Sequence, residues 1–121
     1  MSPAAIAATI AVLTAAGVVV IVAWPRIVEF VRAPVFVETL TFADVIRYFA
    51  NERPNDPRVS SGALMRSPHR RGQLLDQVFL DERDQVCVDA SGAPYGRRLI
   101  AARLDAELAA KFADLDVIVF R

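Results

Sequence analysis

The sequence is poor in the residues that most often build metal and redox sites. Its 121 residues include one cysteine, Cys87, and one histidine, His69. A structural zinc site takes four ligands, most of them Cys or His, so one chain of this composition is not expected to hold one. A single thiol cannot close an internal disulfide. The phosphate-binding and nucleophile patterns GxxxxGK[ST], GxGxxG and GxSxG are also missing. We therefore expect no metal and no cofactor.

The chain also carries no excess of positive or negative charge. Fourteen basic and fourteen acidic side chains give a formal net charge of zero. A nucleic-acid-binding domain usually carries a clear basic excess, so no nucleic-acid partner is expected. All the cations except Lys111 are arginines. Together with the high alanine content, this preference indicates a bacterial protein from a GC-rich genome.

Charge is absent altogether from residues 2–25, and residues 4–24 read AAIAATIAVLTAAGVVVIVAW. About 20 apolar residues at 1.5 Å each cross the hydrocarbon core of a bilayer, so this run predicts a single transmembrane helix. A cleaved signal peptide is the main alternative. It would need a basic start, a shorter apolar stretch and a small-residue cleavage site, and none of these is present.

The cations next to the predicted span give its orientation. Arg26 and Arg32 follow it and no basic side chain precedes it, which favours a cytoplasmic location for the rest of the chain. We expect a single-pass protein of the bacterial cytoplasmic (inner) membrane with its N-terminus outside. Small residues four apart, Ala7, Ala11 and Ala15, would let two such helices approach closely and form a homo-oligomer.

The remaining sequence predicts a small α+β domain. We divide the chain into an anchor with its juxtamembrane extension (1–32), a connector (33–40) and a cytoplasmic domain (41–121). Thr41 followed by Asp44 is typical of a helix start. The apolar patterns then predict an α-β-β-β-α-β order with an antiparallel or mixed sheet. The strands are expected in 59–66, 73–80 and 85–89, the second helix over 97–113 and the last strand at the end. For 73–80 a helix is the alternative.

One stretch, RSPHRRG at 66–72, contains the histidine and three arginines. Its proline and glycine predict a turn, most simply a hairpin tip exposed to water. A second arginine pair lies at the start of the helix predicted over 97–113, where the helix dipole disfavours cations. Asp89 or another carboxylate would neutralise that pair, or it would bind an anionic partner. The candidate contact residues are Arg66, His69, Arg70, Arg71, Arg97 and Arg98.

No set of residues in the sequence forms a recognisable catalytic group. Asp81, Glu82 and Asp84 are expected in a charged hairpin loop, and Cys87 in a strand. The leading interpretation is therefore a membrane-anchored, non-catalytic adaptor or regulatory module that binds an unidentified protein. One alternative is a membrane-tethered hydrolase or toxin-like effector that uses His69, Asp89 and the arginines. Another is a module whose arginines bind anionic lipid headgroups.

Overall fold

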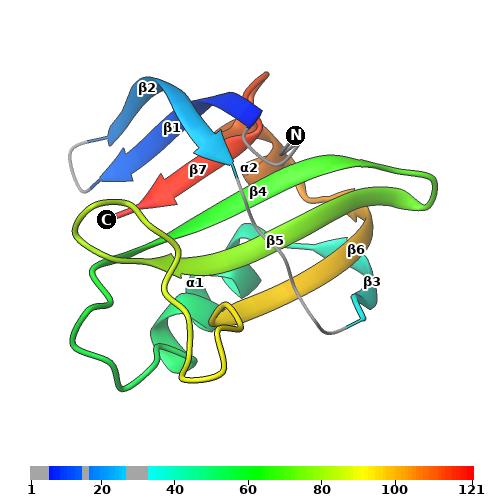
Figure 1. Cartoon of the computed structure of the whole chain (residues 1–121). Coiled ribbons are helices and arrows are strands. Elements are labelled where there is room, and N and C mark those ends of the chain that lie inside the picture. The colour runs from blue at the N-terminus through cyan, green and yellow to red at the C-terminus, as the bar shows by residue number, and fades with distance from the viewer. Residues whose placement is uncertain (1–5, 15–16, 27–32) are drawn as a thin grey trace.

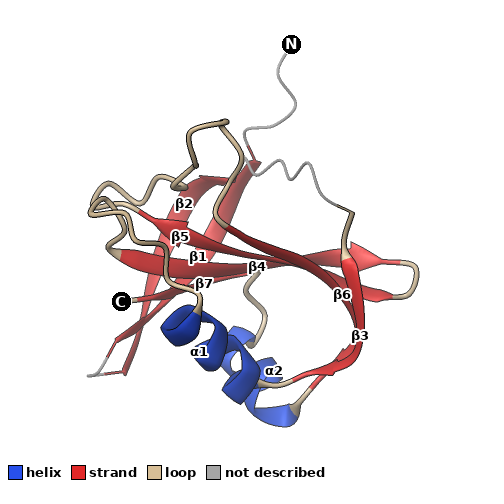
Figure 2. Cartoon of the chain, turned by 90° about the horizontal axis from the view of Figure 1, so that it is seen from below, coloured by secondary structure: helices blue, strands red, loops and turns tan. Residues whose placement is uncertain are grey.

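A mixed β-sheet with two helices against one face makes up residues 33–121 (Figure 1, Figure 2). This computed structural model describes the backbone of residues 6–14, 17–26 and 33–121, and the side chains of residues 33–121. In the domain the strand order is β7-β4-β5-β6-β3. The elements are β3 (Val35–Leu40), α1 (Phe42–Asn51), β4 (Ser61–His69), β5 (Gly72–Leu80), β6 (Gly96–Leu104), α2 (Ala106–Phe112) and β7 (Val117–Phe120). The predicted α+β class is confirmed.

Two parallel strands, β3 and β6, each lead directly into a helix. The predicted helix start after β3 is confirmed, because Oγ1 of Thr41 accepts a hydrogen bond from the Asp44 amide at 3.0 Å. Asp105 has the same position after β6 and accepts from the Leu108 amide at 2.8 Å. The Asp105 carboxylate also accepts from the Phe42 amide at 3.2 Å. One side chain thus satisfies amides at the N-termini of both helices, groups that have no partner within a helix.

The two faces of the sheet bury different sets of apolar side chains, because successive residues of a strand point to opposite faces. In β4, Leu64 packs toward the helices, whereas Ala63 and Met65 lie on the other face. The cluster under the helices includes Leu40, Val45, Leu64, Leu75, Leu99, Ala101, Leu108, Phe112 and Ile118. The cluster on the other face consists of Ala63, Met65, Val78, Leu80, Val117 and Val119.

The helix predicted over 97–113 is wrong in its first half. Residues up to Leu104 form β6, and the helix α2 begins only at Ala106. β6 pairs with β5 on one side and with β3 on the other. Burial between two strands outweighs the helix propensity of this segment, which amounts to a few tenths of a kcal/mol per residue.

The strand predicted over 85–89 is also wrong. This segment makes only two isolated bridges, from Val86 to Leu80 and from Val88 to Pro94. The third strand after α1 is β6 instead. The predicted α-β-β-β-α-β order is therefore present, but its third strand lies later in the sequence than predicted. The segment predicted as a connector, 33–40, contains β3, which pairs with β6.

The backbone of the segment that precedes the domain is traced as two antiparallel strands, β1 (Ile6–Thr14) and β2 (Gly17–Arg26), with β1 beside β7. No side chain of these strands is described, and residues 1–5, 15–16 and 27–32, Ala15 among them, lie outside the described residues. In the described part of the chain, no helix has the length and apolarity to cross a membrane. The membrane helix over 4–24 and its Ala7, Ala11 and Ala15 face stay predictions.

Candidate binding surfaces: a basic hairpin tip and an apolar groove

The second half of the sequence RSPHRRG forms the tip of the β4–β5 hairpin, as predicted, whereas its first three residues are paired within β4. The two strands pair without interruption from Ser61 opposite Leu80 to His69 opposite Gly72. Gly72 has a φ of 136°, and a Cβ atom there would overlap the Ala101 carbonyl of β6. Only glycine combines this backbone conformation with so close an approach. The turn is therefore fixed against β6.

The structure does not bring His69 and Asp89 together. Nδ1 of His69 accepts a hydrogen bond from the Arg71 amide at 3.1 Å, within the turn itself. Asp89 lies in the loop after β5, where its Oδ1 accepts from the Ser91 amide at 2.8 Å. The nine residues of β5 lie between the two regions, a length of about 26 Å at roughly 3.3 Å per residue. A general base needs hydrogen-bond contact with its partners, which this separation prevents.

The contacts of Arg66 are with other parts of the domain. Its Nε donates to the Leu115 carbonyl at 3.0 Å and its NH2 donates to the Ala113 carbonyl at 2.9 Å. Its guanidinium also lies over the Phe112 ring, 4.5 Å from the ring centre. These contacts hold the turn after α2 against β4 and satisfy two carbonyls of that turn. Arg66 therefore packs the domain rather than facing a ligand.

Arg97 and Arg98 are strand residues, not the first residues of a helix, and they point to opposite faces of β6. Arg98 contacts Asp76 through two bonds, of 2.7 and 3.2 Å. A carboxylate therefore neutralises it, as one alternative expected, but the partner is not Asp89. Arg97 donates to Oε1 of Gln77 at 2.8 Å and lies over the Tyr48 ring at 4.2 Å. Burial lowers the pKa of Arg97.

Arg70 and Arg71 remain at the hairpin tip and are exposed. The Arg71 guanidinium lies 4.1 Å from the centre of the Phe36 ring, at the start of β3. Phe36 is 40% exposed and Val35 beside it is 61% exposed. Within residues 33–121, neither arginine forms an ion pair with a carboxylate. The tip and the start of β3 thus combine two cations with an exposed apolar pair, and we call these residues (Val35, Phe36, His69, Arg70 and Arg71) the basic edge.

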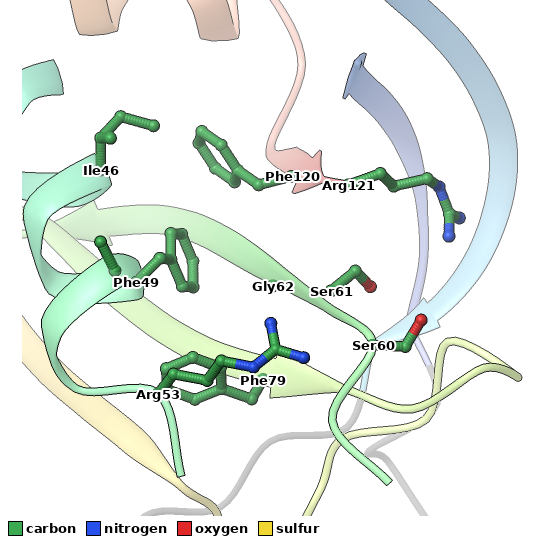
Figure 3. A pocket seen from close by; sticks show the side chains of 10 residues that line it. Ile46, Phe49, Arg53, Ser60, Ser61, Gly62, Phe79, Phe120 and Arg121 are labelled. Carbon is green, nitrogen blue, oxygen red and sulfur yellow. The ribbon is translucent and has the colours of Figure 1, made fainter. Parts of the chain in front are cut away.

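A second surface, the apolar groove, lies at the other end of β4 (Figure 3). Its volume is about 290 Å³. The rings of Phe49, Phe79 and Phe120 form its floor, with ring centres 5.5 Å apart for Phe49–Phe79 and 5.1 Å apart for Phe49–Phe120. Ile46, 42% exposed, stands at the edge. Gly62 makes room for this arrangement, since a Cβ atom there would overlap the Phe49 ring.

The polar groups around the groove are two guanidiniums and two serines. Arg53 donates to the Val59 carbonyl at 2.7 Å, and Arg121 pairs with Asp84 at 2.9 Å. Each of these contacts uses one NH2 group of the arginine. The side chains that line the groove are those of Ile46, Phe49, Ala50, Arg53, Ser60, Ser61, Phe79, Phe120 and Arg121, with Gly62 contributing backbone. This set contains no carboxylate, histidine or cysteine side chain.

The groove was missed by the sequence reasoning. Its one local signal is Gly62, a glycine inside an otherwise apolar strand, which often marks a close approach of another group. The phenylalanines come from α1, β5 and β7, so their convergence follows from the packing of α1 on the sheet and from the strand pairing. Ile46 comes from α1 as well and lies at the groove edge.

The other sequence candidates have structural roles. Asp81 accepts from the Arg83 and Gln85 amides at 2.8 and 3.0 Å, and so closes the predicted charged loop. Cys87 is 3% exposed, and burial raises the pKa of its thiol. No group of three or more His, Cys, Asp and Glu residues is placed to hold a metal ion in the part of the chain that the structure describes.

Comparison with known proteins provides no relative: no family model, no curated protein and no solved structure matches this chain.

Proposed function

We propose that this chain is a single-pass protein of the bacterial cytoplasmic membrane whose α+β domain is a non-catalytic binding module. The apolar run over 4–24 supports the anchor, because it has the length and freedom from charge that a membrane helix needs. The apolar groove carries the binding role. We assign to it a segment of a partner protein that presents one apolar side chain next to a carboxylate.

The size and lining of the groove favour this occupant. At about 290 Å³ it lies at the lower limit of small-molecule and cofactor sites, which span roughly 300–1,000 Å³. It accommodates one large side chain. The three phenylalanine rings provide an apolar contact surface, and Arg53 places its guanidinium beside it. The Arg121 guanidinium, which pairs with Asp84, points away from the rings (Figure 3). Arginine forms strong, geometrically defined contacts with carboxylates.

The same lining argues against hydrolysis at this position. Acid–base or nucleophilic catalysis needs a base, an acid or an activated nucleophile within hydrogen-bond contact of the substrate. No side chain of that kind, apart from two serines, lines the groove, and no histidine or carboxylate stands beside those serines in the lining. The alternative hydrolase that uses His69 and Asp89 gains no support either, because the length of β5 separates the two.

A titration with 3-phenylpropionate tests the groove directly. This probe carries one ring and one carboxylate, and 3-phenylpropanamide is its neutral control. We expect saturable chemical-shift changes in the full chain, in detergent, at the amides around Phe49, Gly62 and Phe79. The acid should bind more tightly than the amide, and Arg53→Gln should remove most of that difference. Shift changes that are scattered over the domain, or equal for acid and amide, would contradict the proposal.

Photo-crosslinking in the bacterial membrane tests for the partner itself. A benzophenone amino acid replaces Ile46 at the groove edge, and the control carries it at Glu107, an exposed position of α2. A single crosslinked protein is expected from position 46 only, and 3-phenylpropionate at saturating concentration should reduce its yield. Equal crosslinking from both positions would exclude the groove as the contact.

A further inference from the structure

We infer that the basic edge rests on the anionic headgroups of the leaflet that carries the anchor, so that the domain lies on the membrane in one orientation. This inference rests on the proposed membrane anchor and names the surface that faces the lipid. Its residues come from two elements, β3 and the β4–β5 tip, which lie at the same end of the sheet in both views (Figure 1, Figure 2).

Exposed apolar side chains are concentrated at this edge. Three large apolar side chains in residues 33–121 are strongly exposed, and two of them are Val35 and Phe36. The third, Ile46, belongs to the groove. Water-exposed apolar groups next to cations are the arrangement that binds membrane interfaces, where the apolar groups enter the headgroup boundary. The Arg71 guanidinium already lies on the Phe36 ring, which leaves its N–H groups at the ring periphery for phosphate oxygens.

The charges at the edge fit an anionic surface. Arg70 and Arg71 are exposed and form no ion pair with a carboxylate of residues 33–121. The nearest acidic residue of β3, Glu38, is paired with Arg103 at 3.2 Å. The edge therefore carries about two uncompensated positive charges although the whole chain has a net charge of zero. Each cation near an anionic leaflet contributes about a fivefold preference for the docked state.

The path of the chain places this edge near the bilayer. Val35 follows Trp24, the last residue of the predicted span, by eleven positions. Those positions cover about 17 Å if helical and at most roughly 40 Å if fully extended. β3 is therefore the first element of the domain that the anchor can bring to the headgroups. The groove lies at the opposite end of β4, about 26 Å from the tip. Docking by the basic edge leaves the groove facing away from the lipid.

Paramagnetic broadening by a gadolinium-labelled lipid tests the contact on the full chain in nanodiscs. With anionic lipid we expect the amides of Val35, Phe36 and residues 69–72 to broaden most. The broadening should decrease in neutral nanodiscs and in high salt. Arg70→Gln with Arg71→Gln should lower the ratio of docked to undocked domain about thirtyfold. The matched control, Arg47→Gln with Arg83→Gln, removes two exposed cations elsewhere on the domain and should leave the ratio unchanged.

The outcomes separate this inference from the proposed function. Extraction of the full chain by alkaline carbonate would contradict the anchor itself. A chain that stays in the membrane, but broadens first at α1, at α2 or at no site, would overturn the basic edge alone. Equal broadening in anionic and neutral nanodiscs would also overturn it, as would loss of docking in the control variant. If a protein partner covers this edge instead, the isolated chain in nanodiscs will show no broadening there.

Discussion

The ion pair between Asp76 and Arg98 can be used to test how burial determines the contribution of an ion pair to the free energy of unfolding. The two side chains face each other across β5 and β6, with Nε–Oδ1 and NH2–Oδ2 distances of 2.7 and 3.2 Å. Only 5% of the Asp76 side chain and 24% of the Arg98 side chain are exposed. Removal of one partner from a buried pair costs about 3–5 kcal/mol, because the remaining charge stays buried without compensation.

The two single substitutions should differ in size. Asp76→Ala leaves Arg98, which is partly exposed and reaches water, so we expect a loss near the lower limit, about 3 kcal/mol. Arg98→Met leaves the more deeply buried carboxylate and should cost about 4–5 kcal/mol. Asp76→Leu combined with Arg98→Met replaces both charges with apolar groups. This double variant should unfold within about 1 kcal/mol of the wild type.

Urea unfolding of the full chain in a mild detergent, followed by circular dichroism, measures all of these free energies. The pair Arg103–Glu38 is the matched control, since it also joins β6 to its neighbour but is 65% and 66% exposed. Its coupling free energy should lie at about 0.2–1 kcal/mol. Equal coupling in the two pairs, or a double variant as unstable as the singles, would refute the argument from burial.

Two further predictions concern acid stability and helix capping. The Arg58 guanidinium, bonded to Asp56, lowers the pKa of that carboxyl from 3.8 to about 2. Asp56 therefore stabilises the fold above about pH 4, and this contribution is lost as the pH falls through about 2. In a carbon-13 NMR titration Arg58→Met should return the Asp56 pKa toward 3.8; no change would exclude the ion pair as the cause. Asp105→Ala removes the acceptor for both helix N-termini, so we expect a loss of about 2 kcal/mol, twice that of an ordinary cap, and a melting temperature about 10 °C lower. Asp105→Asn should retain most of that stability, and equal melting of the Ala and Asn variants would exclude the capping role.

The elements predicted correctly are those for which the spacing of the apolar residues and a boundary residue indicated the same element. Thr41 marked the start of α1, and Gly72 marked the hairpin tip; both have these roles in the structure, whereas Pro68 lies within β4 opposite Gln73. Local chemistry decides such positions, because an N-cap or a tight turn depends on a few neighbouring residues. The α+β class followed from the sum of these elements.

The error over 97–113 has a specific cause. Ile100 and Leu104 are four residues apart, and this spacing fits both a helix period of 3.6 and a strand period of two. The arginines of this segment and its alanines are good helix formers, so propensity pointed the same way. Asp105 was the overlooked signal, because aspartate is a typical N-cap residue and here its side chain accepts a hydrogen bond from the Leu108 amide.

The groove could not be predicted because it depends on strand order. Phe49, Phe79 and Phe120 belong to three elements that are far apart in the sequence. The pairing of β4 with β5 and β7 brings two of the rings together, and the packing of α1 on the sheet adds Phe49. The basic edge was half predicted. The sequence identified Arg70 and Arg71, whereas the contact of Arg71 with Phe36 needed the placement of β3.

The location of residues 4–24 decides the environment of β7. In the structure, the backbone of β1 runs beside β7, with Ile10 opposite Val117 and Val12 opposite Val119. A helix in the bilayer would satisfy its own backbone hydrogen bonds and leave β7 as the edge of the sheet. β7 has only four residues, and natural sheets often end in strands this short, which offer little backbone for unwanted pairing. With the chain in nanodiscs, the amides of β7 that do not bond to β4 should therefore exchange with deuterium much faster than those that do. Uniformly slow exchange along β7 would show that β1 keeps its place beside it and would contradict the anchor.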